Sequence, residues 1–170
     1  MPAGPLRLPL AWQIDEADAF IIVGDGEPPG RRQLEASGKP ILRANVLPVG
    51  GDQLRGRRVV AFAGIGRPSK LFESLAGLGA VLAASLPFAD HHDYSEAEAA
   101  ALIDRADREN ALLVTTEKDL VRLPTGGARG ELRRRSIALV VEARLATTDS
   151  ECLDRLIDVA LSRRPPPAPA

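Results

Sequence analysis

Six short apolar runs, separated by helix-like patterns, limit what this chain can fold into more than any other feature. Several of them are continuously hydrophobic rather than alternating, which is typical of strands covered by helices on both faces. The runs span residues 19–24, 41–47, 58–63, 81–86, 112–116 and 137–142. From residue 58 the order is strand, helix, strand, helix, strand, short helix, strand and helix. This alternation predicts an α/β fold with a parallel, Rossmann-like sheet.

Apolar residues at helical spacing predict three helices between and after these strands. One begins after Pro68, and another begins after Ser95, which forms a capping-box pattern with Glu98. A third helix near the end of the chain has the clearest stripe. The three stripes are Leu71, Phe72, Leu75 and Leu78; Ala99, Leu102, Ile103 and Ala106; and Leu153, Leu156, Ile157, Ala160 and Leu161.

The 170 residues suit one domain of ordinary size or slightly more. Residues 1–55 are rich in proline and glycine, and we predict a connector with a partial α/β piece there. Residues 56–164 are predicted to form the α/β domain. The last segment, 165–170 (PPPAPA), is predicted to be a disordered tail because it contains no side chains that could form a core.

Charge and composition narrow the possible partners. The net charge of −1 gives no electrostatic footprint for nucleic acid. A local basic cluster is expected to be solvated surface, with a phosphate or anionic-lipid role as the alternative; it comprises Arg129, Arg133, Arg134 and Arg135. A single cysteine, Cys152, excludes an internal disulfide and favours the cytoplasm. No apolar run is long enough to cross a bilayer, so any membrane contact is expected to be peripheral.

Polar loops follow three of the predicted strands, at residues 64–70, 88–94 and 115–119. Ligands of open α/β sheets bind beyond the carboxyl ends of parallel strands, so we expect these loops to line one cleft. The simpler alternatives are a tight turn for the first loop and a helix N-cap at Thr116 for the third. The predicted contacts to substrate or nucleotide are Gly64, Gly66, Lys70, Thr116, Glu117, Lys118 and Asp119.

The middle loop contains Asp90-His91-His92 and thus both histidines of the chain. An imidazole beside a carboxylate can exchange protons near neutral pH, so His91 and Asp90 are candidates for acid–base chemistry. Helix capping or packing against Tyr94 is the structural alternative. Zinc needs three or four ligands, and this loop with a distant cysteine does not supply them, so no metal site is predicted.

The chain has no G-x-x-x-x-G-K-[ST] sequence to hold nucleotide phosphates. The nearest glycine-rich stretch, 24–30, lacks the lysine and hydroxyl, and its two prolines remove backbone donors. We therefore do not expect this chain to drive nucleotide chemistry unaided.

Several blocks resemble the C-terminal part of the bacterial tetraacyldisaccharide 4′-kinase family. They are VVAFAGIGRPSKLFESLAGLGA at 59–80, PFADHHDYSEAE at 87–98, LLVTTEKDLVRLP at 112–124, PAGPLRLPL at 2–10 and ADAFIIVG at 17–24. The blocks cover most of the chain in the right order, and AGIG, DHH and TTEKD are specific together.

This resemblance implies an ATP- and Mg²⁺-dependent kinase that phosphorylates the 4′ position of the lipid A disaccharide precursor. It implies work at the cytoplasmic face of the inner membrane of Gram-negative bacteria. Family members combine an N-terminal P-loop domain, a β connection and a smaller C-terminal α/β domain. By motif match, His91 with its neighbour Asp90 assists a catalytic aspartate, and Lys118 and Asp119 belong to the interdomain cleft.

The sequence also departs from the family pattern. Met1 stands inside the family's L-P-A-G-P-L-R block, and Leu8 replaces a common glutamate. The P-loop domain, the acidic metal ligands and the base aspartate are expected to be absent from this chain. We thus expect a C-terminal fragment or split half, inactive alone and dependent on a P-loop partner. A stand-alone module that binds an anionic sugar or nucleotide is the alternative, and a vestigial gene product is a third possibility.

Overall fold

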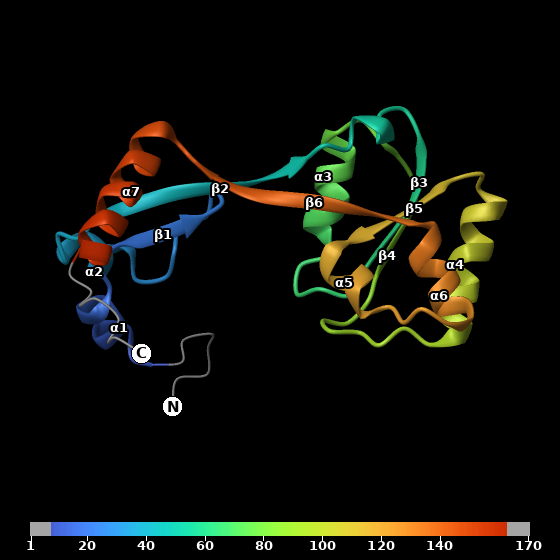
Figure 1. Cartoon of the computed structure of the whole chain (residues 1–170), viewed down its shortest axis with the longest axis horizontal. Coiled ribbons are helices and arrows are strands. Elements are labelled where there is room, and N and C mark those ends of the chain that lie inside the picture. Colours follow the sequence, from blue (N-terminus) through green and yellow to red (C-terminus); the bar gives the residue numbers. More distant parts are fainter. Residues whose placement is uncertain (1–7, 163–170) are drawn as a thin grey trace, which may run out of the picture. The chain divides into compact units, whose positions relative to one another are not determined.

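The computed structural model describes residues 8–162, and the chain divides into two compact units. Unit 1 consists of Met1–Val46 and Ala143–Ala170, and unit 2 of Leu47–Glu142. The chain passes from one unit to the other within β2 and again within β6 (Figure 1). The predicted tail, 165–170, lies outside the described residues.

All six predicted strands are present, within a few residues of their expected ends. They are β1 (Phe20–Val23), β2 (Ile41–Val49), β3 (Arg58–Ala63), β4 (Val81–Pro87), β5 (Leu112–Thr116) and β6 (Ser136–Leu145). The helices are α1 (Leu10–Glu16), α2 (Arg31–Ala36), α3 (Ser69–Gly77), α4 (Glu96–Arg108), α5 (Glu117–Arg122), α6 (Gly127–Arg135) and α7 (Thr147–Ser162), with a 3₁₀ turn at Asp52–Leu54. The structure confirms an α/β fold, whereas α1, α2, the 3₁₀ turn and a second helix between β5 and β6 were not predicted.

Unit 2 is a parallel sheet with strand order β4-β3-β5-β6. The side chains of β3 alternate between two cores, one on each face of the sheet. Val60 and Phe62 pack with α4 and α6, while Val59 and Ala61 pack with α3. The helices accordingly lie on opposite sides of the strands (Figure 1). Burial on both faces explains why this strand is continuously apolar.

The strand order of unit 2 reverses at β3. The connection through α3 leads from β3 to its neighbour β4. The connection through α4 then leads back to β5, the neighbour on the opposite side of β3. The loops after β3 and β5 therefore diverge to opposite faces. In open α/β sheets this switch point is where ligands bind.

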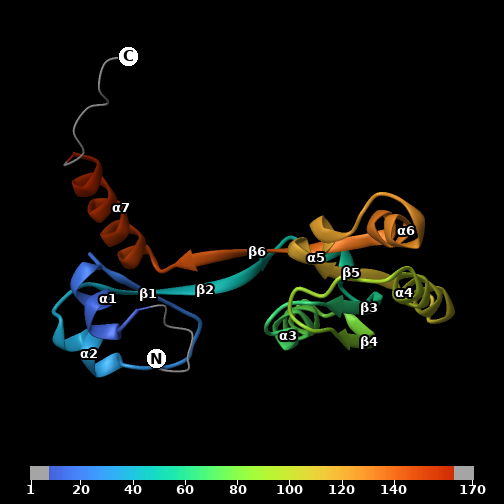
Figure 2. The ribbon, with the colours of Figure 1, turned by 90° about the horizontal axis from the view of Figure 1, so that it is seen from below.

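Unit 1 contains the parallel pair β1–β2. Helices α1 and α2 lie on one side of the pair and α7 on the other (Figure 2). The Arg43 backbone N–H donates to Asp149 Oδ2 at 2.8 Å, which ties α7 to β2. In this division α7 lies in the same unit as the N-terminal segment, whereas the predicted domain at 56–164 grouped it with the preceding strands.

The apolar stripe of α7 predicted the helix but not its surroundings. No residue of α7 is buried, and Ile157 and Leu161 are exposed. Cys152, which lies in the same helix, is half-buried. Among residues 8–162, no helix is both long and apolar enough to span a membrane.

Candidate functional site

Three polar loops of unit 2 meet at the carboxyl ends of β3, β4 and β5. We call them the loop cluster and define it as residues 64–68, 88–95 and 116–122. Parallel pairing places these three strand ends on one edge of the sheet. The His91 backbone N–H donates to Gly64 O at 2.9 Å, and the Gly64 N–H donates to Asp119 Oδ2 at 3.2 Å. The three loops therefore converge as expected, and single hydrogen bonds connect them.

Gly64 lies at the centre of the loop cluster and leaves no room for a side chain. A Cβ at this position would lie 2.9 Å from His92 Cβ, 3.1 Å from Ala89 O and 3.2 Å from Asp119 Oδ1. These contacts come from both of the other loops. Glycine is thus required here for close approach rather than for an unusual backbone angle.

Asp119 is the buried carboxylate of the loop cluster, with no exposed surface. Its Oδ2 accepts hydrogen bonds from Gly64 N and from the Thr116 hydroxyl, the latter at 2.7 Å. Thr116 in turn caps α5 by accepting from the Asp119 N–H at 3.1 Å. The predicted N-cap is confirmed. The same hydroxyl also donates a hydrogen bond to the Asp119 carboxylate, whose burial without hydrogen bonds would be destabilising.

Arg122 completes the ion pair of Asp119 and was not among the residues singled out from the sequence. Its Nη1 lies 3.6 Å from Asp119 Oδ1 and donates to Gly64 O at 3.2 Å. Its Nη2 lies 3.0 Å from His91 Nδ1. The only sequence signal was its position in the last turn of the helix capped by Thr116, three residues after Asp119.

His91 carries an exposed imidazole on an unusual backbone. Its φ of 61° lies in the left-handed region, which costs a residue with a Cβ about 1–2 kcal/mol. The side chain is 77% exposed, and Nε2 lies 3.8 Å from Asp90 Oδ1. Such strain persists only where surrounding contacts impose it, and it is often found at functional sites.

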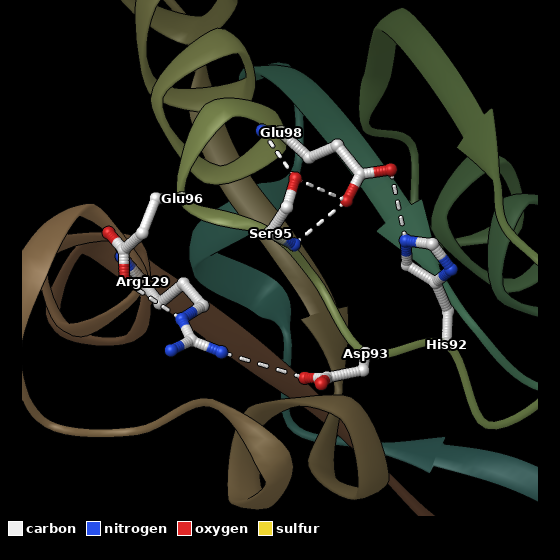
Figure 3. Close-up of polar contacts among 6 residues, drawn as sticks. All are labelled: His92, Asp93, Ser95, Glu96, Glu98 and Arg129. Atoms are coloured by element: carbon white, nitrogen blue, oxygen red, sulfur yellow. Dashed lines mark hydrogen bonds and ion pairs between the residues drawn. The ribbon is translucent and has the colours of Figure 1, made fainter.

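His92 has the opposite character, although it is the next residue. Its ring packs near Phe88 and Tyr94, with centroid distances of 4.8 Å and 5.0 Å. Its Nε2 lies 3.1 Å from Glu98 Oε1. Figure 3 shows this contact beside the capping box, in which Ser95 and Glu98 exchange hydrogen bonds. The predicted capping box is confirmed, and His92 is a packing residue.

Two ionisable groups here have displaced pKa values. Burial, and after it the charge of Asp119, raises the pKa of the Tyr94 phenol. The Tyr94 hydroxyl and Asp119 Oδ1 are both buried and form no hydrogen bond with described residues. Hydrogen bonds from the Ser95 N–H, then the Ser95 hydroxyl and then His92, lower the pKa of Glu98. Each shift reinforces the state that the group already has at neutral pH, a neutral Tyr94 and an ionised Glu98.

The structure brings together some of the predicted site residues and separates others. Gly66 is close to Asp90, since a Cβ on Gly66 would lie 3.5 Å from Asp90 Oδ2. Lys70 instead points to Glu73 at 3.1 Å on the exposed side of α3. Glu117 and Lys118 are exposed at the start of α5. Of the predicted cleft residues, Gly64 and Gly66 thus lie against the loop that contains Asp90 and His91. Asp119 bonds to Gly64, and Thr116 bonds to Asp119.

The basic cluster of α6 is largely matched by acidic partners. Arg129 Nε lies 2.9 Å from Glu96 Oε1, and its Nη1 lies 3.6 Å from Asp93 (Figure 3). Arg134 pairs with Glu131, and Arg135 with Asp107, while Arg133 donates to Leu123 O at 2.7 Å. These pairs support the expectation of an ordinary solvated surface.

Comparison with known proteins assigns the chain to a family. The sequence pattern of the tetraacyldisaccharide-1-P 4′-kinase family matches residues 1–161. The chain belongs to this family. Its resemblance to the family, carried by the AGIG, DHH and TTEKD blocks, is thereby confirmed.

Individual relatives agree with this assignment. A tetraacyldisaccharide 4′-kinase of Methylorubrum extorquens is 44% identical over 164 residues, which are 95% of this chain and 48% of the relative. One of Rhodospirillum centenum is 46% identical over 164 residues, covering 95% of this chain and 46% of the relative. The chain spans about half the length of the curated relatives it matches. No solved structure matches it.

Proposed function

We propose that this chain is the C-terminal half of a tetraacyldisaccharide 4′-kinase. The complete enzyme would transfer the γ-phosphoryl group of ATP to the 4′-hydroxyl of tetraacyldisaccharide 1-phosphate in lipid A biosynthesis. Family membership supports the reaction, because relatives carrying that name match nearly the whole chain. The observation that carries the proposal for this half is the exposed His91, which follows β4 and contacts the loops at the switch point of the unit 2 sheet.

The local geometry suits His91 for assisting a proton transfer. Its backbone is fixed by Gly64 O, and its ring projects with most of its surface free. Asp90 places a carboxylate 3.8 Å from Nε2, which can orient the ring. We therefore assign His91 as the residue that assists the catalytic aspartate in deprotonating the sugar hydroxyl, with Asp90 as its neighbour. An assisting acid–base group of this kind contributes roughly 10²–10⁴ in rate.

The described residues do not fit the phosphates of ATP or a bound Mg²⁺. The sequence has no G-x-x-x-x-G-K-[ST], and residues 8–162 contain no group of three His, Cys, Asp or Glu side chains that could hold a metal ion. In our proposal ATP and Mg²⁺ are held by a P-loop partner, corresponding to the part of the relatives that this chain does not match. The same partner would supply the base aspartate and bring the enzyme to the cytoplasmic face of the inner membrane.

A second function is favoured by the completeness of the loop cluster. All its contacts come from unit 2, so it could bind an anionic sugar or nucleotide without a partner. Titration of the lone chain with ATP and with the disaccharide tests this possibility. Saturable binding that is lost in both His91→Ala and Lys118→Ala would support a non-catalytic module.

A chimaera tests the proposed half directly. The part of the Rhodospirillum centenum relative that this chain does not match would be fused to the present sequence. We expect the chimaera to phosphorylate tetraacyldisaccharide 1-phosphate, with the intact relative as the positive control, and the lone chain to show no turnover. Turnover by the lone chain would contradict the assignment as a half enzyme. A folded but inactive chimaera would contradict the kinase assignment.

A further inference from the structure

The contact between Arg122 and His91 determines which nitrogen of the imidazole carries its proton. Arg122 Nη2 lies 3.0 Å from His91 Nδ1. A guanidinium has only donors and stays protonated in proteins. His91 Nδ1 must therefore be the acceptor, and the proton of the neutral ring must be on Nε2. Protonation of Nδ1 as well would place two N–H groups of two cations against each other.

A second neighbour favours the same tautomer. Asp90 Oδ1 lies 3.8 Å from His91 Nε2, where a carboxylate favours an N–H rather than a lone pair. Nδ1 thus faces the Arg122 donor and Nε2 faces the Asp90 acceptor, as the Nε2–H tautomer requires.

Arg122 is itself held in place by the buried part of the loop cluster. Its Nη1 donates to Gly64 O, the same oxygen that accepts from the His91 backbone N–H. Asp119, which is fully buried, offsets the guanidinium charge at 3.6 Å. One carbonyl and one carboxylate thereby fix the guanidinium relative to the histidine that it contacts.

We propose that Arg122 is a positioning residue that fixes His91 as its Nε2–H tautomer. His91 then offers a hydrogen-bond donor to an anionic oxygen, either a carboxylate or a phosphate oxygen, and not a lone pair. That this oxygen takes part in a kinase reaction rests on the proposed function. The tautomer does not, because it follows from contacts within unit 2.

Imidazole ¹⁵N NMR of the full, untagged chain at pH 8 tests the proposal. The chain has only two histidines, and His91→Asn identifies the His92 signals while suiting the left-handed backbone. We expect His91 to be protonated on Nε2 alone, and Arg122→Gln to give a mixture of tautomers. Arg122→Lys should restore part of the preference. Arg133→Gln is the matched control, since its guanidinium donates to Leu123 O.

Two NMR results would overturn the proposal. One is protonation of His91 on Nδ1 in the parent chain. The other is an unchanged His91 pattern in Arg122→Gln that keeps the parent circular dichroism. The parent spectrum decides the first point even where neither variant folds.

The chimaera adds a kinetic measurement. There Arg122→Gln should lower kcat about tenfold or more and leave KM within about threefold. The reason is that a His91 ring in the wrong tautomer weakens the chemical step but not the binding of substrate. An unchanged kcat would count against the role in catalysis. An inactive parent chimaera would refute the proposed function, while the NMR result would still decide the tautomer.

Discussion

Units 1 and 2 contain similar kinds of apolar side chains but use them differently. In unit 2, Phe62 and Leu75 are fully buried, and both core clusters among the described residues belong to this unit. In unit 1, Trp12, Ile157 and Leu161 are 52%, 46% and 61% exposed. Unit 2 thus contains the larger apolar core, and it is the unit that carries the loop cluster.

The difference teaches that an apolar pattern predicts an element but not what covers it. The stripe of α7 is as regular as that of α4, yet only α4 has buried residues. In unit 1 the exposed side chains are consistent with a missing partner, as the proposed P-loop half would be.

The largest expected effect comes from truncating a buried side chain, and it should differ between the two units. Phe62→Ala should lower the free energy of unfolding by about 4 kcal/mol, because it leaves a cavity in the core of unit 2. The matched change in unit 1, Ile157→Ala, should cost about 0.5 kcal/mol at most, since that side chain is half exposed. Urea unfolding measures both. Equal losses would break the contrast between the units.

A smaller effect is expected at the centre of the loop cluster. Gly64→Ala should destabilise by about 2 kcal/mol, because its Cβ would press on His92 and on the Ala89 carbonyl. Gly77→Ala is the control: it lies in α3, has open space around it, and should stabilise by about 0.5–1 kcal/mol. Thermal unfolding compares the two variants. A neutral Gly64→Ala would mean that the three loops are not tightly packed.

The smallest stability effect concerns pH. The pKa of Glu98 is lowered in the folded chain, so its contribution is present above its ordinary value of 4.5 and is lost as pH falls through the folded value. Glu98→Gln should therefore lose less thermal stability than the parent between pH 6 and pH 3. The difference should be roughly 0.5 kcal/mol, since the side chain is partly exposed. Ser95→Ala should cost about 1 kcal/mol near pH 6 through the cap, and it should also weaken this pH dependence because its hydroxyl donates to Glu98. Parallel curves for Glu98→Gln and the parent would contradict this.

Sequence patterns accounted for much of unit 2. Continuous apolar runs located its strands, and hydroxyl residues before acidic ones located the caps at Ser95 and Thr116. These features are local, so they follow from neighbouring residues alone. The same is true of the placement of three loops at strand ends, which requires only that the sheet be parallel.

The chemistry within the loop cluster depended on distances that sequence does not contain. Asp119 was expected to line a cleft, but it is buried and holds Gly64 and Thr116. Arg122 reaches His91 only because two loops, 31 residues apart in the chain, fold together. The left-handed backbone of His91 carries no sequence signal comparable to a glycine.

The rate of phosphoryl transfer by the chimaera with His91→Ala tests the central claim most directly. His91 is exposed, so its removal should leave the melting temperature within about 2 °C of the parent. The transfer rate to the disaccharide should fall by about 100-fold or more, as expected for loss of an assisting acid–base group. Arg134→Ala, an exposed change on α6, is the control and should retain the parent rate. A His91→Ala rate within twofold of the parent would contradict the account.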